Sequence, residues 1–357
     1  MPCSDIAIVS DAWHPQINGV VRTLDTVRAE LEGAGREVTM ITPDRFRSVA
    51  CPTYREIRLS MDAWYKLPRL LDRHHPAHIH IATEGPLGMA ARRYCLKRGL
   101  RFTTSFHTRF PEYLLRMFGI PQCLTYRFLR RFHGSAAAML VSTQSMREEL
   151  QRHGFTNAAP WTRGVDTALF RPLDSREGVL NYPRPIHLYV GRVSKEKNID
   201  AFLSLPLAGT KLVVGDGPQL AELRQKYPQA IFAGSKHGEE LMRYYAGSDV
   251  FVFPSRTDTF GLVMLEALAC GTPVAAYPVT GPKDVIRDPA VGVLDEDLSR
   301  AIAKARTLNR AACVRYAEAF SWKRCATMFA ESLVLAGQAT SRPSTRWSTR
   351  SAAAAKP

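Results

Sequence analysis

Short apolar runs alternate with helix-forming segments in this chain, and the pattern occurs twice. In the first half, the run 5–10 is followed by a glycine-containing loop, by apolar residues at helical spacing between 20 and 31, and by a second run at 38–41. Short apolar runs are typical of strands buried on both faces of a parallel sheet. Repeated strand–helix–strand units indicate a doubly wound α/β domain.

A second series of the same kind begins near residue 185, after a segment rich in proline and polar residues that is typical of a linker between domains. We therefore predict two Rossmann-like domains, residues 1–170 and 171–318. The Ser/Thr/Arg/Ala-rich tail, 337–357, is predicted to be disordered. Ligands of doubly wound sheets bind beyond the carboxyl ends of the strands. We expect a cleft there to bind a nucleotide in one half and a second substrate in the other.

The sequence shows neither the patterns that direct a protein into or across a membrane nor the cysteine motifs of metal, redox or disulfide-rich proteins. No window approaches about 18 uninterrupted apolar residues, and the first residues lack the basic region of a signal peptide, so we expect a cytoplasmic protein. The 7 cysteines include no Cys-x-x-Cys pair, which argues against a zinc ribbon, a redox motif or a disulfide framework.

The net charge of +15 is unevenly distributed. Residues 171–318 carry 19 basic and 17 acidic residues, whereas residues 92–131 hold ten basic residues and one acid. A basic excess favours nucleic acid, anionic membrane or phosphorylated ligands. Aromatic residues alternate with arginine over 126–132, which suits a membrane interface. The same pattern would suit nucleic acid, for which no motif is present, or an ordinary solvated helix face.

Two acids, Asp258 and Glu266, stand eight positions apart, where a strand is expected to end and a helix to begin at Gly261. Free backbone N–H groups at such a helix start attract anions. Both acids can face the cleft and accept hydrogen bonds from sugar hydroxyls. The alternative makes Asp258 a helix N-cap and Glu266 a solvated surface charge, and the residues alone leave both interpretations open.

Other candidate residues also stand at expected strand ends. Gly191 lets the backbone turn beside Arg192 and Lys197, two cations that can hold a diphosphate, although such residues are usually a solvated charge run. His107 follows a strand on the rim of the expected cleft, where a lone histidine is more often structural. Two weaker signals are a Gly-x-Gly turn and the loop before the first helix, where a phosphate can approach: Gly215 and Gly217, and Gly19 with Val20.

Four histidines within seven residues are spaced closely enough to suggest zinc. They are His74, His75, His78 and His80. No cysteine or acid lies within these seven residues, and two of the histidines lie on an expected strand. We therefore do not predict a metal site here.

The segment from Asp258 to Val274 resembles the E-x7-E signature of retaining glycosyltransferases of family 4, which have the GT-B fold. The resemblance extends over about residues 5–335, because the other motifs follow in the family's order. This chain has Asp where the family has its first Glu. The form Thr-Asp-Thr-Phe-Gly, and the pattern His-Thr-x-x-Pro-x-Tyr that begins at His107, resemble a subgroup that includes sulfoquinovosyl-diacylglycerol synthases and GDP-mannose-dependent α-mannosyltransferases.

The resemblance implies a role for each group of residues. Glu266 binds the ribose of a nucleotide sugar, and Asp258, with the backbone that follows it, positions the transferred sugar. Arg192 and Lys197 stabilise the departing diphosphate, and His107 orients the sugar or the incoming hydroxyl. The remaining residues line the donor pocket: Gly19, Val20, Gly191, Gly215, Gly217, Phe260, Gly261 and Leu262. The last helix, 319–336, is expected to cross back onto the first domain.

These expectations describe a retaining enzyme that transfers a hexose or hexuronic-acid-type sugar from a UDP- or GDP-linked donor to a membrane lipid of the diacylglycerol type. It would form an α-glycolipid by front-face attack, with the leaving phosphate as base and without a metal or other cofactor. The acceptor domain would dock peripherally on the inner face of the cell membrane, with no nucleic-acid partner. Alternatives are a GDP-mannose-dependent mannosyltransferase acting on a lipid-linked or saccharide acceptor, a sugar-nucleotide epimerase on the same fold, and a catalytically silent binding protein.

Overall fold

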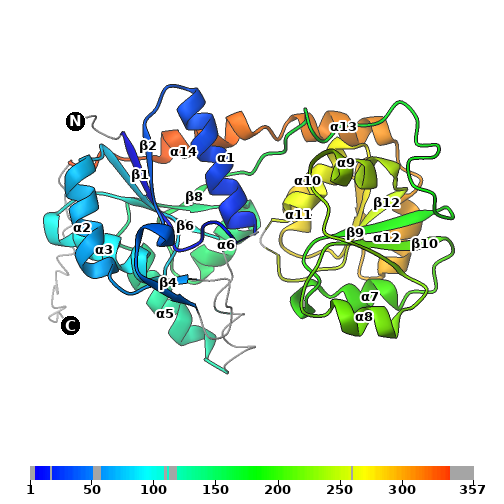
Figure 1. Ribbon diagram of the computed structural model, residues 1–357, viewed down its shortest axis with the longest axis horizontal. Coiled ribbons are helices and arrows are strands. Elements are labelled where there is room, and N and C mark those ends of the chain that lie inside the picture. Colours follow the sequence, from blue (N-terminus) through cyan, green and yellow to red (C-terminus); the bar gives the residue numbers. More distant parts are fainter. Residues whose placement is uncertain are drawn as a thin grey trace, which may run out of the picture.

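The computed structural model describes residues 5–16, 18–50, 58–107, 111, 119–258 and 260–337, and contains two α/β domains that lie side by side (Figure 1). The N-terminal domain has a parallel six-stranded sheet in the order β2-β1-β5-β6-β7-β8. Its strands are β1 (Ile6–Val9), β2 (Val38–Ile41), β5 (His78–Ile81), β6 (Thr103–Phe106), β7 (Ala138–Val141) and β8 (Ala158–Pro160). Its helices are α1 (Gly19–Gly33), α2 (Ala63–His74), α3 (Pro86–Arg98), α5 (Gln122–His133) and α6 (Gln144–Arg152). A short 3-10 turn (Pro43–Arg45) precedes an antiparallel hairpin of β3 (Ser48–Ala50) and β4 (Arg58–Ser60).

The second domain has a parallel sheet of the same size, in the order β11-β10-β9-β12-β13-β14. Its strands are β9 (Ile186–Val190), β10 (Thr210–Val214), β11 (Ile231–Gly234), β12 (Val250–Phe253), β13 (Val274–Ala276) and β14 (Gly292–Leu294). Its helices are α7 (Ile199–Leu203), α8 (Leu220–Lys226), α9 (Gly238–Gly247), α10 (Leu262–Ala269), α11 (Pro282–Val285), α12 (Leu298–Ala305) and α13 (Arg310–Glu318). The predicted fold class, two doubly wound Rossmann-like domains, is confirmed.

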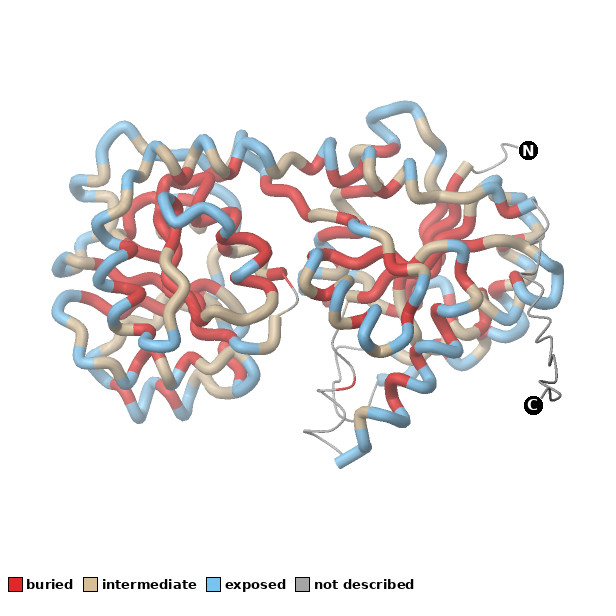
Figure 2. Tube along the Cα trace, turned by 180° about the vertical axis from the view of Figure 1, so that it is seen from behind, coloured by how far each residue is buried: buried red, intermediate tan, exposed pale blue. Residues whose placement is uncertain are grey.

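The central strands of both sheets are buried along their whole length, as the red segments inside each domain show in Figure 2. β1, β9, β10 and β12 consist mainly of Val, Ile, Leu and aromatic residues. Such runs stabilise a sheet covered on both faces, because each buried aliphatic side chain contributes about 1.5–3 kcal/mol.

In each sheet the strand order changes direction beside the first strand of the domain. β1 pairs with β2 on one side and with β5 on the other, and β9 pairs with β10 and β12 in the same way. A crevice opens beyond the carboxyl ends of the strands at such a point. The loops after β1, β9 and β12 are therefore the segments that position a ligand site.

The last helix, α14 (Trp322–Ser332), packs against α1 of the N-terminal domain, and the orange ribbon of α14 lies beside the blue ribbon of α1 in Figure 1. The indole Nε1 of Trp161 donates a hydrogen bond to the carbonyl of Cys325 over 3.1 Å. The ring of Phe329 lies 4.7 Å from that of His80 and 5.3 Å from that of Trp161, centroid to centroid. The end of the described chain is thus part of the N-terminal core.

Some sequence predictions fall on residues outside the described ranges. They include the tail beyond Gly337, and the segments 108–110 and 112–118 of the basic stretch. Within the described ranges, no helix combines the length and the apolar character that a bilayer crossing requires.

We expect Phe329→Ala to lower the free energy of unfolding by about 3–5 kcal/mol, because a buried ring is replaced by a cavity. Thr327→Ala, at an exposed position of the same helix, is the control and should change stability by less than about 0.5 kcal/mol. Urea denaturation followed by circular dichroism measures both. Equal effects of the two substitutions would contradict the packing of α14 on the N-terminal core.

Candidate active site

The loops that follow β9 and β12 meet through an ion pair between two of the residues singled out in the sequence. Lys197 Nζ lies 2.5 Å from Asp258 Oδ1. Asn198 follows in a left-handed conformation (φ 55°), and its side-chain amide donates to the carbonyl of Pro254 over 3.1 Å. The second carboxylate oxygen of Asp258, Oδ2, is buried and has no hydrogen-bond partner among the described residues. This oxygen therefore has an unused hydrogen-bond acceptor position in the described part of the structure.

Glu266 is buried at the boundary between the domains, with 2% of its surface exposed, so its interpretation as a solvated surface charge is wrong. It lies on α10, whose other residues are apolar. Tyr245 donates its hydroxyl proton to Glu266 Oε2 over 2.7 Å, and Arg22 of α1 forms an ion pair with Oε1. Burial, and next the charge of Glu266, raise the pKa of Tyr245 well above its usual value, so this hydroxyl remains a donor.

Three glycines bring the loops after β9 and β10 into backbone contact. An added Cβ on Gly215 would lie 1.9 Å from the carbonyl oxygen of Gly191, and one on Gly217 would lie 2.4 Å from that of Val193. The φ angles of Gly191, Gly215 and Gly217 are 149°, 139° and 157°. Val193 N–H donates to the carbonyl of Asp216 over 2.8 Å in the same contact. The Gly-x-Gly motif therefore has a packing function in addition to any contact with a ligand.

Arg192 follows Gly191 in this loop and is exposed, while its carbonyl accepts a hydrogen bond from Tyr189 over 2.9 Å. Gly261, with φ 87°, is the N-cap of α10, and a Cβ there would approach Phe253 to 2.9 Å. Phe260 is buried against the core of the second domain, and Leu262 packs against the cores of both domains.

On the N-terminal side, Gly19 is the first residue of α1, and an added Cβ would meet no atom within 4 Å. The N-cap of this helix is Asn18, whose side-chain oxygen accepts hydrogen bonds from Val20 N–H and Val21 N–H over 3.0 and 3.1 Å. In this loop, where a phosphate is expected to approach, the Val20 N–H thus donates to Asn18, while the surface at Gly19 is open.

His107 lies at the carboxyl end of β6, beside the side chains of Trp161 and Arg163. Its ring is 5.7 Å from that of Trp161, and Arg163 Nη2 is 3.3 Å from Nδ1. Burial, and next the Arg163 guanidinium, hold the pKa of His107 well below its usual value, so the imidazole is neutral at neutral pH. Burial lowers the pKa of Arg163 to about 10. Arg163 also donates to the carbonyls of Trp161 and Thr162, over 2.8 and 3.1 Å.

Three histidines of the histidine-rich segment have roles in the fold: one bonds to hydroxyl groups inside the domain, and two end a helix. His80 is buried, and its two ring nitrogens each lie 2.8 Å from a hydroxyl oxygen, of Thr103 and of Ser105. Burial lowers the pKa of His80 to about 3. His74 ends α2, and His75 is its left-handed C-cap. The described residues include no group of three or more side chains arranged to hold a metal ion.

Sequence reasoning missed Arg22, Tyr245 and Asp11. Arg22 lies one turn into α1, three residues after Gly19. This spacing, which places it near the candidate phosphate loop, is the sequence pattern that could have identified it. Asp11 caps α3: its carboxylate accepts hydrogen bonds from the N–H groups of Leu87 and Gly88 over 2.8 and 3.2 Å. Burial raises the pKa of Asp11 in spite of these bonds. No local pattern marks the role of Tyr245.

In comparisons with known proteins, each half of the chain matches a glycosyltransferase family model. A family model described as Glycosyltransferase Family 4 matches residues 17–169, and one described as Glycosyl transferases group 1 matches residues 184–308. The GDP-mannose-dependent alpha-mannosyltransferase of Mycobacterium tuberculosis (strain CDC 1551 / Oshkosh) is 30% identical over 316 residues, which cover 81% of this chain and 83% of that protein. The sulfoquinovosyl transferase SQD2 of Arabidopsis thaliana is 30% identical over 78% of this chain and 61% of its own length.

The alpha-monoglucosyldiacylglycerol synthase of Streptococcus pneumoniae (strain ATCC BAA-255 / R6) is 27% identical over 84% of this chain and 78% of that protein. Among solved structures, the sucrose-phosphate synthase from Thermosynechococcus elongatus superposes with a TM-score of 0.72 at 24% identity and covers 91% of this chain and 97% of its own. This likeness supports the same two-domain fold.

Gly215→Ala tests the contact between the loops after β9 and β10. We expect it to destabilise the protein by about 1–3 kcal/mol, because the added methyl group overlaps the Gly191 carbonyl. Gly33→Ala, at the end of α1 with no atom within 4 Å of the new methyl group, should instead be neutral or stabilise by about 0.4–1 kcal/mol. Thermal unfolding of the two variants distinguishes these effects, and an unchanged melting temperature for Gly215→Ala would contradict the described packing.

Proposed function

The chain belongs to family 4 of the glycosyltransferases, and from this premise we propose that it transfers a sugar from a nucleotide-diphosphate sugar to a membrane lipid of the diacylglycerol type, with retention of configuration. The observation that carries the proposal is the meeting of Lys197 and Asp258 at the carboxyl ends of β9 and β12, with the buried Glu266 on the helix that follows.

The chemistry of these three side chains matches the parts of a nucleotide sugar. Glu266 accepts hydrogen bonds from the ribose hydroxyls, and the buried Oδ2 of Asp258 accepts one from the transferred sugar. Lys197 stabilises the negative charge that develops on the departing diphosphate, together with the exposed Arg192 of the same loop. Removal of one such stabilising donor typically slows an enzyme by about 10²–10³-fold.

His107 completes the site from the N-terminal domain. Because its pKa is held low, the imidazole is neutral and can exchange a hydrogen bond with a sugar or acceptor hydroxyl without adding charge. We propose front-face attack, in which the leaving phosphate accepts the proton of the incoming hydroxyl. No metal is assigned a role.

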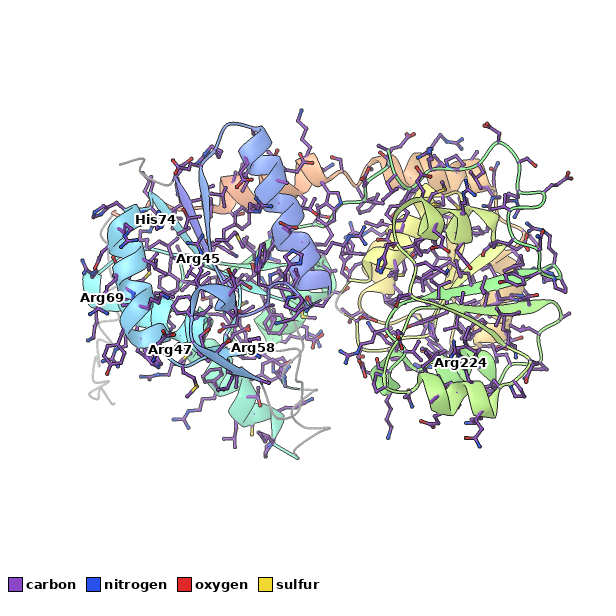
Figure 3. The ribbon with its side chains drawn as sticks, in the orientation of Figure 1. Arg45, Arg47, Arg58, Arg69, His74 and Arg224 are labelled. Atoms are coloured by element: carbon purple, nitrogen blue, oxygen red, sulfur yellow. The ribbon has the colours of Figure 1, made fainter. Side chains whose placement is uncertain are left out.

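Exposed apolar side chains support a lipid acceptor. Among the described residues, the large ones lie on the N-terminal domain or on the segment packed against it, and Tyr65 and Met61 are 74% and 64% exposed. One group surrounds the β3–β4 hairpin and the start of α2, and another lies on α5 and the residues before it. The members are Val49, Met61, Trp64 and Tyr65, and Ile120, Leu124 and Phe128. Figure 3 labels basic side chains on the segment before β3, on β4 and along α2: Arg45, Arg47, Arg58, Arg69 and His74, the last at the far end of α2 from the first group.

The structure corrects which residues of the basic stretch face solvent. Of the three aromatic residues that alternate with arginine, Phe128 is exposed, whereas Tyr126 and Phe132 are buried. The ring of Tyr126 stacks on that of His153 at 3.7 Å. Arg92 donates hydrogen bonds to the carbonyls of Phe132 and Arg131, over 3.0 and 2.6 Å, so it holds α3 to α5. The proposed membrane-facing surface therefore includes the β3–β4 hairpin and α2, which the sequence did not suggest.

A second candidate is mannosyl transfer from GDP-mannose to a lipid-linked or saccharide acceptor. It is favoured by the 30% identity with the mycobacterial GDP-mannose-dependent alpha-mannosyltransferase over 81% of this chain. The two candidates use the same site and differ in the acceptor, and the second is restricted to GDP-mannose as the donor.

One experiment separates these functions. Purified protein is incubated with membrane lipid and, in separate reactions, with UDP- and GDP-linked sugars, and the lipid extract and the soluble fraction are analysed by mass spectrometry. A glycosylated lipid from one donor is the expected result. Product confined to soluble saccharides would exclude the lipid acceptor, and an isomerised donor without transfer would identify an epimerase.

In this assay, we expect Lys197→Ala to lower kcat by about 10²-fold or more, because the leaving diphosphate loses a cation. Lys195→Ala, an exposed lysine of the same loop, is the matched control and should remain within about twofold, since surface substitutions rarely exceed about 0.5 kcal/mol. Turnover near the wild-type rate in folded Lys197→Ala would remove Lys197 from the proposed chemistry.

Vesicle co-sedimentation tests the proposed membrane-facing surface. Tyr65→Glu and Leu124→Glu should each weaken binding to vesicles containing anionic lipid by about tenfold, because each loses a buried apolar contact of about 1.5 kcal/mol or more. Gln225→Glu, at an exposed position of the second domain, controls for the added charge. Binding should also fall as salt rises. If the control and the two surface variants bind alike, the membrane lies elsewhere.

A further inference from the structure

One ion pair links the two domains directly at the proposed ribose carboxylate. Arg22 of α1 pairs with Glu266 of α10. The Arg22 guanidinium also lies over the ring of Phe170, with its central carbon 5.8 Å from the ring centroid. Phe170 stands where the chain leaves the N-terminal domain, so Arg22 contacts the second domain and the segment that leads to it.

Because Glu266 is buried, the loss of its ion pair with Arg22 would be energetically unfavourable. Glu266 is 2% exposed, whereas Arg22 is 41% exposed at its side chain. Removing Arg22 would leave the buried Glu266 carboxylate without a compensating charge, which is unfavourable in a site shielded from water. Tyr245 supplies a hydrogen bond but no charge. Compensation of Glu266 by Arg22 therefore requires the two domains to stay together.

A second buried carboxylate, that of Asp284, also connects the domains, but its partner is a backbone N–H group rather than a charged side chain. Asp284 Oδ1 accepts a hydrogen bond from the N–H of Ser145, in the first turn of α6, over 3.0 Å. A helix start is a favourable place for an anion. Arg22 differs from this contact because its partner, Glu266, is also the proposed partner of the nucleotide.

We propose that Arg22 is a positioning residue that couples nucleoside diphosphate binding to the approach of the two domains. The proposal rests on the function proposed above, in which the ribose hydroxyls bind to Glu266. Ribose and Arg22 then compete for one carboxylate, so binding releases the guanidinium. Arg22 lies one helical turn from Gly19, at the helix end assigned to the diphosphate. At this helix end, the released guanidinium can bind a phosphate of the diphosphate in place of the Glu266 carboxylate. Arginine binds both kinds of anion through two N–H groups.

The ion pair itself is tested by small-angle X-ray scattering of the protein without added nucleotide. Arg22→Gln should increase the radius of gyration and broaden the distance distribution, because the domains lose a connecting charge pair. Arg28→Gln is the matched control: Arg28 is on the same helix and pairs with Asp25 and Glu32 of that helix. Scattering curves that coincide for wild type and Arg22→Gln would overturn the proposal. Arg22→Lys, which retains the charge, should remain close to wild type and covers the case in which Arg22→Gln is poorly folded.

The competition is tested by calorimetric titration with uridine, guanosine and their diphosphates. For the base that binds, Arg22→Gln should bind the nucleoside at least as tightly as wild type, because a competitor for Glu266 is gone. It should bind the diphosphate about tenfold more weakly, within the usual range of coupling between sites. A merely structural role would shift both affinities together, and equal shifts would overturn the coupling. If wild type binds neither diphosphate, the proposed function fails and the coupling fails with it.

Discussion

The burial of one carboxylate governs how the two halves of this protein meet. Glu266 lies on a helix of otherwise apolar residues and is almost removed from water. A charge in such a place requires a cation and hydrogen-bond donors. The donor, Tyr245, comes from the same domain, but the cation, Arg22, comes from the other. The electrostatic requirement of the second domain is therefore met by the first, at the site proposed to bind a nucleotide sugar.

Close backbone contact is the second requirement of the site. The loops after β9 and β10 touch at Gly191 and Gly215, where any side chain would overlap a carbonyl oxygen or a tyrosine ring. This contact holds the segment that carries Arg192 and Lys197. Lys197 then reaches Asp258 across the neighbouring strand end, so the backbone of two loops sets the position of this ion pair.

The C-terminal helix adds a second covalent connection between the two domains. The chain passes from the first domain to the second, and α14 then returns to pack on α1, while its Phe329 packs against His80 of β5 and Trp161 after β8. Two chain crossings limit how far the domains separate. Arg22 lies on the helix that α14 covers, so the proposed exchange of Arg22 between Glu266 and a phosphate would act on a helix that is already anchored.

The doubly wound class follows from the residue pattern alone, because the alternation of apolar runs and helical spacing is local. The same pattern also placed Asp258, Lys197 and His107 at strand ends, where parallel sheets bind ligands. The partner of Glu266 depends on the packing of the two domains, since Arg22 and Glu266 are 244 positions apart and no local pattern relates them. Packing likewise decided that Tyr126 and Phe132 are buried while Phe128 is exposed, and that His80 bonds to hydroxyl groups of the neighbouring strand. Periodicity reports which face of an element is apolar, but the partner of that face depends on how the elements pack.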